Sequence, residues 1–296
     1  MNWPNNWRRM TVPIIIRRRK LGMTSCREIA ARSETGIQWV RNDKQFPEGH
    51  DLVFRWGCTS NVPVKNVVNT AKAIHQVSDK SGFRMLLDEH DLCPSTFLRP
   101  GDVPQEVVEA GMVVRPAVHS RGRKLTVVYT YPDLQAAMLE YGAGAYCGSL
   151  IPKVAEYRVF VVQGRAVAVA QKTPGNPDDV AWNVAKGGRF DNVRWDDWNL
   201  KMVRTAIEGF NLSELDFGGV DVMVDAEGEC YILEINSAPS LTSEYRQTCF
   251  TKAFDYIVRN GKERIPLVPE RGGYLKFIHP AVCDRAKIVE KFEGVA

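Results

Sequence analysis

One stretch of the sequence, residues 219–236, limits what this chain can fold into more than any other. Val220, Val222 and Val224 alternate with Asp221 and other residues, and after a turn rich in Asp, Glu and Gly the alternation resumes. Alternation with a period of two on both sides of a polar turn is typical of an antiparallel β-hairpin. The sequence therefore predicts two paired strands late in the chain.

This hairpin would bring acidic side chains together. If Val224 pairs with Tyr231, then Asp221 lies opposite Glu234, and Asn236 follows two residues later on the same face. Carboxylates that face each other repel, so we expect the patch to bind a cation, and all-oxygen ligands suit Mg²⁺. A shift of one residue would separate the two carboxylates. A solvated acidic hairpin is the alternative interpretation.

Bulk properties exclude several classes of protein. The 296 residues predict about two domains. The net charge of +4 requires neither nucleic acid nor a membrane as partner. The seven cysteines are scattered and form no C-x-x-C, which favours free thiols in a reducing compartment. Residues 1–7 do not resemble a signal peptide, and no apolar run could span a membrane. We expect a cytoplasmic protein.

Other segments give less specific signals. Residues 66–77 and 250–258 are compatible with helices, and residues 157–172 predict a second hairpin around Gln163-Gly164. Residues 181–191 are polar and glycine-bearing, which predicts a loop. A basic, glycine-centred loop at residues 119–124 could cradle an anion or be a plain surface turn. The sequence contains no P-loop and no dinucleotide-binding fingerprint.

The late hairpin and its continuation, residues 219–241, resemble the metal-binding motif of the ATP-grasp superfamily, in particular the branch of ribosomal-protein glutamate ligases and amino-acid ligases. The resemblance extends over residues 12–250. It implies that Asp221, Glu234 and Asn236 are the ligands of Mg²⁺, with Mn²⁺ as an alternative ion.

The same resemblance assigns further roles. Lys80 would contact an ATP phosphate, and Arg115 stands where the family usually has lysine. Ser120 and Gly122 would cover the phosphates, and the hinge residues Ser149 and Ile151 would contact the nucleotide, although this hinge lacks the acidic residue often present there. The residues that would act on the reacting groups are Arg158, Lys172 and Asn183.

The fold implied is the ATP-grasp fold of the α/β (α+β) class, in which two α+β subdomains clamp ATP between antiparallel sheets. The expected division is an N-terminal α/β domain (1–78), a central subdomain (79–150), a C-terminal subdomain with the metal site (151–260) and an extension (261–296).

The implied activity is ATP-dependent ligation of a carboxylate to an amine through an acyl phosphate. The substrates would be ATP, a carboxylate, and an amine from an amino acid, a peptide or a protein tail. Related ligases often self-associate, so a homo-oligomer is a further expectation. Two alternatives stay open at this point: a kinase of the same fold, and a nucleotide-binding protein without activity.

Overall fold

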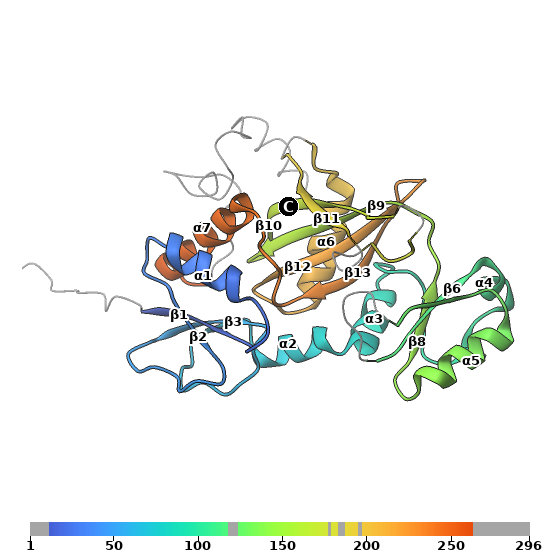
Figure 1. The fold of residues 1–296 in the computed structure, drawn as a ribbon, viewed down its shortest axis with the longest axis horizontal. Helices are drawn as coiled ribbons and strands as arrows, with labels where there is room; N and C mark the ends of the chain where they lie inside the picture. Colours follow the sequence, from blue (N-terminus) through green and yellow to red (C-terminus); the bar gives the residue numbers. More distant parts are fainter. Residues whose placement is uncertain (1–11, 118–123, 177–178, 183–186, 195–196, 263–296) are drawn as a thin grey trace, which may run out of the picture.

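The computed structural model describes residues 12–117, 124–176, 179–182, 187–194 and 197–262. In these residues the chain forms one parallel and two antiparallel β-sheets, with helices packed against them (Figure 1). The expected mixed α/β class is confirmed.

The first sheet is parallel and has the strand order β2–β1–β3–β4. Its strands are β1 (Pro13–Arg17), β2 (Gln38–Arg41), β3 (Leu52–Trp56) and β4 (Val67–Val68). Every residue of β1 and β3 is buried, which explains why these strands are continuous apolar runs rather than alternating ones. Helix α1 (Met23–Arg32) covers one face.

Helix α1 begins earlier than the sequence suggested. We expected Thr24 or Ser25 to cap it, but the N-cap is Gly22, with φ 69° and no side-chain hydrogen bond. A Cβ at Gly22 would lie 2.4 Å from Cδ1 of Trp56, so this position requires glycine both for its backbone conformation and for space.

The second sheet is antiparallel, with the order β5–β8–β6–β7. Its strands are β5 (Thr96–Phe97), β6 (Met112–Arg115), β7 (Thr126–Val128) and β8 (Tyr146–Ser149). Helices α4 (Gln105–Ala110) and α5 (Tyr131–Tyr141) pack on it, after a 3₁₀ turn at Pro100–Asp102. These elements enclose a hydrophobic core of their own, built around Met112, Leu134 and Cys147.

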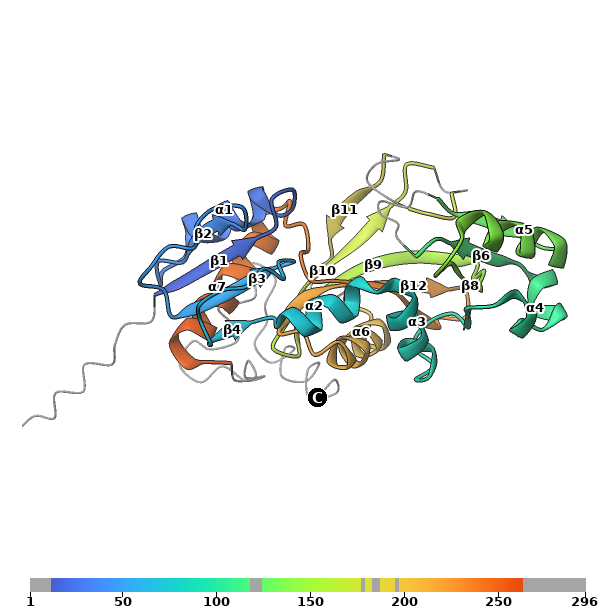
Figure 2. The ribbon, with the colours of Figure 1, turned by 90° about the horizontal axis from the view of Figure 1, so that it is seen from below.

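The third sheet is antiparallel, with the order β11–β10–β9–β12–β13, and forms the centre of the molecule (Figure 2). Its strands are β9 (Lys153–Val162), β10 (Arg165–Thr173), β11 (Arg189–Asn192), β12 (Phe217–Asp225) and β13 (Cys230–Asn236). Helix α6 (Leu200–Leu212) packs against it. Strand β11 lies partly in the segment predicted as a loop. Its residues are mostly exposed, so it lacks the apolar alternation that reveals a strand.

Two short helices, α2 (Ala71–Ser78) and α3 (Lys80–Asp88), connect the first sheet to the second. The helix expected from residue 66 begins only at Ala71, because Asn69 has a positive φ of 65°. The buried side chain of Asn69 accepts hydrogen bonds from the backbone of Asp216 and Phe217. These bonds fix the connection to β12 and postpone the start of the helix.

The last described helix, α7 (Glu244–Asn260), is longer than the predicted 250–258 and returns to the first sheet beside α1 (Figure 1). Phe254 stacks on Phe54 with ring centroids 4.2 Å apart, and Phe217 of β12 lies 5.3 Å from Trp56. The first and third sheets therefore share one continuous core.

Each sheet lies within one of the three ranges expected for the domains, and the division into separate domains stays a prediction. Among the described residues, no helix has both the length and the apolar character needed to cross a membrane.

Candidate active site

Three neighbouring strands align the polar side chains at the centre of the third sheet. Arg158 of β9 pairs with Asp221 of β12, and Asp221 pairs with Glu234 of β13. Asn236 follows two residues after Glu234, on the same face. The expected opposition of Asp221 and Glu234 is confirmed.

The register of this hairpin differs from the expected one near its turn. Val224 pairs with Cys230, not with Tyr231, and the register shifts by one residue between Asp221 and Val222. The extra residue is Leu233, so a β-bulge restores the pairing of Asp221 with Glu234. The predicted pairing was wrong at the turn and right at the carboxylates.

Arg158 and Asp221 form a bidentate ion pair at the sheet centre. Nε and Nη2 of Arg158 lie 2.5 and 2.7 Å from the two carboxylate oxygens of Asp221. Burial alone would lower the pKa of Arg158, but the charge and hydrogen bonds of Asp221 outweigh it and raise this pKa above its usual value. The guanidinium also lies over the ring of Phe190, 4.7 Å from its centroid. Arg158 is a permanent, oriented cation here.

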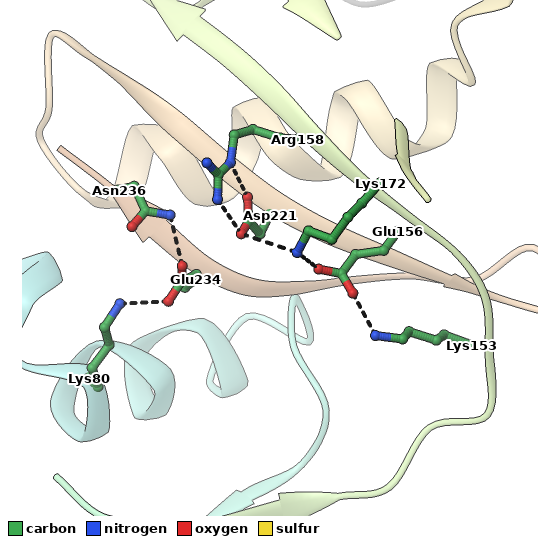
Figure 3. A network of polar contacts seen from close by, with 8 residues as sticks. All are labelled: Lys80, Lys153, Glu156, Arg158, Lys172, Asp221, Glu234 and Asn236. Atoms are coloured by element: carbon green, nitrogen blue, oxygen red, sulfur yellow. Dashed lines mark hydrogen bonds and ion pairs between the residues drawn. The ribbon is translucent and has the colours of Figure 1, made fainter. Parts of the chain in front are cut away.

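Glu234 is held by two donors. Nζ of Lys80 lies 2.9 Å from Oε2, and Nδ2 of Asn236 donates to Oε1 at 3.0 Å (Figure 3). Burial would raise the pKa of Glu234, yet the charge of Lys80 and these hydrogen bonds, with a contribution from Arg158, hold it well below its usual value. Glu234 is an ionised ligand throughout the physiological pH range.

A second acidic centre was missed in the sequence. Glu156 of β9 is 2% exposed and lies between two lysines (Figure 3). Nζ of Lys153 is 2.5 Å from its Oε2, and Nζ of Lys172 contacts its Oε1 and lies 3.8 Å from Asp221. The signal was available in the sequence, because Glu156 alternates with Arg158 and therefore shares its face of the strand.

These contacts join the two centres into one network of alternating charge. Its members in Figure 3 are Lys80, Lys153, Glu156, Arg158, Lys172, Asp221, Glu234 and Asn236. Four of them are cations gathered on one face of the sheet, an arrangement that suits a polyanion such as a nucleotide triphosphate.

The oxygens of Asp221, Glu234 and Asn236 fit a divalent cation. They come from adjacent strands, and carboxylate and amide oxygens are the ligands that Mg²⁺ prefers. In the described residues no three His, Cys, Asp or Glu side chains form a metal-binding group. The third protein ligand would therefore be the amide of Asn236. The cations now on the carboxylates, Arg158 and Lys80, hold them ionised and ready for a metal.

The remaining predicted residues lie around this network. Arg115 ends β6, and its charge helps to lower the pKa of Lys153, an effect in which burial is the largest cause. Arg115 is therefore near the lysine pair. Ser149 ends β8 and Ile151 lies between β8 and β9, so both are in the connection between the two sheets. The predicted residues Ser120, Gly122 and Asn183 lie outside the described residues.

The segment after Asn236 is fixed to the first sheet. The N–H of Gly57, at the end of β3, donates to the carbonyl of Ser237 at 3.2 Å. A Cβ at Gly57 would lie 2.8 Å from Cβ of Ala238, so the two backbones approach closely. The metal ligands are thus supported from both sides, by the third sheet and by the first.

A central antiparallel sheet with an acidic ligand pair, facing a smaller antiparallel sheet, defines a nucleotide-clamping fold. A family model of the ATP-grasp domain, the third family of one clade of that superfamily, matches residues 66–254, more than half of the chain. The chain therefore belongs to this ATP-grasp family. The resemblance to the ATP-grasp superfamily is confirmed.

Known proteins agree with this assignment at the level of the fold. A D-alanine–D-alanine ligase of Laribacter hongkongensis (strain HLHK9) is 32% identical over 99 residues, which are 30% of this chain and 30% of the relative. The chain thus matches less than a third of that relative's length.

Two solved structures cover nearly their whole length. A D-alanine–D-alanine ligase from Bacillus anthracis complexed with ATP has a TM-score of 0.61 at 12% identity, over 85% of this chain and 97% of its own. A RiPP-associated ATP-grasp ligase from Chryseobacterium gregarium, in complex with ADP and a leader and core peptide, has a TM-score of 0.57 at 13% identity. This match covers 86% of this chain and 98% of its own.

Proposed function

We propose that the protein is an ATP-dependent carboxylate–amine ligase that forms an amide or peptide bond and releases ADP and phosphate. The observation that carries this proposal is the charge network on the third sheet. Its paired carboxylates, Asp221 and Glu234, can hold a metal, and its cations can hold a triphosphate beside them. The family and the relatives that are ligases support the same assignment.

In this proposal a substrate carboxylate attacks the γ-phosphorus of ATP. The products are an acyl phosphate and ADP. An amine then attacks the acyl carbon, and phosphate leaves while the nitrogen loses a proton. The first step brings an anion to a polyanion, so cations must offset the repulsion. Arg158 and Lys172, oriented by Asp221 and Glu156, supply fixed positive charge at the reacting phosphate.

Lys80 and Arg115 would bind the other phosphate oxygens from the opposite side of the site. Asp221, Glu234 and Asn236 would hold Mg²⁺, or Mn²⁺ in its place. A bound Mg²⁺ neutralises phosphate oxygens and fixes their orientation. Ser149 and Ile151 would contact the nucleotide base and sugar from the connection between the sheets. Ser120, Gly122 and Asn183 remain proposed site residues on the strength of the sequence resemblance.

The proposed substrates are ATP, an acid, and an amine borne by an amino acid, a peptide or a protein tail. The Chryseobacterium ligase is in complex with a leader and core peptide, which supports a peptide as one candidate. The described cysteines are free thiols. They support a reducing compartment such as the cytoplasm as the place of the reaction.

The test is ADP release from ATP with pools of amino acids and peptides, followed by mass spectrometry of the product. A ligase gives ADP, phosphate and a product lighter by one water than its two substrates. A kinase of this fold gives ADP and a stable phosphorylated product, and a binding protein gives no ADP. Either of these results would overturn the proposal.

Variants connect the activity to the site. Glu234→Gln should lower ADP formation at least ~100-fold, because it removes a charged metal ligand. Glu227→Gln, in the exposed turn of the same hairpin, is the matched control and should keep the wild-type rate. Chelation by EDTA should abolish activity, and Mg²⁺ should restore it.

A further inference from the structure

One buried cation on the same side of the molecule has no role in the mechanism above. Arg246 lies in the first turn of α7 and is 2% exposed. Its Nε donates to Oγ of Ser243 at 2.7 Å, and its Nη2 donates to Oγ1 of Thr242 at 3.1 Å and to the carbonyl of Phe190 at 3.4 Å. These three acceptors are all neutral.

Arg246 has no carboxylate partner among the described residues. None of their Asp or Glu side chains lies within 4.0 Å of it. The nearest acid that acts on its charge, Asp191, is exposed and paired with Arg189. Nη1 of Arg246 donates no hydrogen bond to any described residue. One edge of the guanidinium is therefore unused.

The surroundings make this charge unfavourable. Burial, with the neighbouring charge of Arg158 as second cause, lowers the pKa of Arg246 to about 10. A buried ion without a counter-ion destabilises a protein, and apolar residues of the same volume usually replace it when stability alone matters. The position of Arg246 is explained if a ligand brings the missing negative charge.

The location indicates which ligand. The guanidinium lies 5.7 Å from the ring of Phe160, two residues after Arg158 on β9 and hence on the same face of the sheet. Phe190, whose carbonyl accepts from Arg246, has its ring against Arg158. Arg246 therefore lies on the reacting face, beyond Arg158, where a substrate rather than the metal would be bound.

We propose that Arg246 binds a carboxylate of the amine-donating substrate, a carboxylate that does not react. The inference rests on the proposed ligase activity and specifies its substrate class: an amino acid, or a peptide whose own carboxylate is free. An anchoring group must keep its charge throughout the reaction. The reacting carboxylate does not, because it becomes an acyl phosphate and then an amide. Arg158, Lys172 and the metal ligands already surround that reacting centre.

The experiment separates the two substrate roles chemically. Acids are supplied as a pool of N-acetyl-amino acids, which cannot act as amines. Amines are supplied either as the twenty amino acids or as the corresponding amino-acid amides, which cannot act as acids. Wild-type protein should use the amino acids about 100-fold better than the amides in kcat/KM, as expected for loss of a buried charge pair. Equal use of both by the wild type would overturn the proposal.

Variants show whether Arg246 causes this preference. In Arg246→Gln the ratio should fall below about fivefold, through loss of activity on the amino acids only. Arg259→Gln removes an exposed arginine of the same helix, paired with Glu34, and should keep the wild-type ratio. An unchanged ratio in Arg246→Gln would overturn the proposal. ADP release with either amine would still support the ligase.

A ligand-free measurement decides the case in which none of these pools is turned over. Because the charge of Arg246 is unpaired, Arg246→Met should unfold at or above the wild-type Tm and should still bind ATP. If Arg246 is a structural residue, its removal lowers Tm by more than about 5 °C, and the proposal fails. Wild-type protein that neither binds ATP nor releases ADP would instead contradict the proposed function itself.

Discussion

Nζ of Lys80 lies 2.9 Å from Oε2 of Glu234 and joins α3 to the last strand of the third sheet. A residue predicted to touch a phosphate thus contacts a residue predicted to bind the metal. A phosphate that bridges the two would exchange this ion pair for contacts of its own with Lys80 and Mg²⁺. The ion pair thereby marks where metal and phosphate would meet.

The Lys80–Glu234 pair should be visible in the pH dependence of stability. The pKa of Glu234 is depressed below the ordinary 4.5. As pH falls below about 4.5, the unfolded chain binds a proton that the folded carboxylate refuses. The pair's contribution is therefore complete above that pH and lost below it.

We expect the unfolding free energy of the wild type to fall more steeply than that of Glu234→Gln between about pH 4.5 and 3. The difference in slope is at most about 1.4 kcal/mol per pH unit, and smaller because a third of the side chain is exposed to solvent screening. Urea unfolding at several pH values measures it. Glu227→Gln should keep the wild-type slope, and identical slopes for all three proteins would contradict the assignment.

Glu156 should control the charge of the lysine pair. Glu156→Gln leaves Lys153 and Lys172 buried without their anion, so we expect a loss of about 3 kcal/mol of stability. The pKa of the lysines should fall, because burial then acts unopposed. ATP turnover should accordingly be lost at a lower pH on the alkaline side.

A profile of kcat/KM for ATP between about pH 6 and 10 measures this shift. Glu156→Asp restores the charge and should return the alkaline limb toward its wild-type position. An alkaline limb that does not move in Glu156→Gln would show that the lysines are not held charged by this carboxylate.

Gly209 marks the closest approach of α6 to the third sheet. A Cβ at this residue would lie 2.2 Å from Cδ1 of Ile232 and 3.1 Å from Cδ2 of Leu87. Gly209→Ala should therefore destabilise the protein by about 1–2 kcal/mol, even though alanine favours helix. Chemical denaturation measures the effect. Ile232→Val removes the clashing methyl group, so in the double variant the two losses should not add. Additive losses would exclude this contact as the cause.

Asp255 of α7 links the two ends of the described chain. It is 3% exposed and accepts hydrogen bonds from both Oγ of Ser33 and Oγ1 of Thr35, as well as from the backbone of Glu34 and Thr35. Asp255→Asn presents an NH₂ group to these donors and should cost about 2 kcal/mol. Thermal unfolding measures it. The exposed neighbour Glu34 is the control, since Glu34→Gln should change stability by less than about 0.5 kcal/mol.

The sequence predicted the parts of the site that depend on local alternation. The pattern of β12 and β13 placed Asp221 and Glu234 on one face, and the resemblance assigned Arg158 and Lys172 to the same site. The bulge at Leu233 left no signal, because its residue continues the alternation on paper and only the pairing with the neighbouring strand reveals it.

Other parts depend on contacts between distant segments and could not be predicted from spacing. The cap of α1 is set by Trp56, thirty-four positions after Gly22. Asn69 delays α2 through hydrogen bonds to residues 216 and 217. Arg246 looked like an ordinary charged residue near a helix start, and only its burial shows otherwise.

The separate core of the second sheet has a mechanical consequence. The first and third sheets are joined by aromatic packing and by the bond between Gly57 and Ser237, so they must move as one body. The second sheet packs its apolar residues among themselves and is joined to the rest by the connection at Ile151 and by the one that follows α3. A nucleotide can therefore enter and leave by rotation of this sheet alone, with the metal ligands left undisturbed.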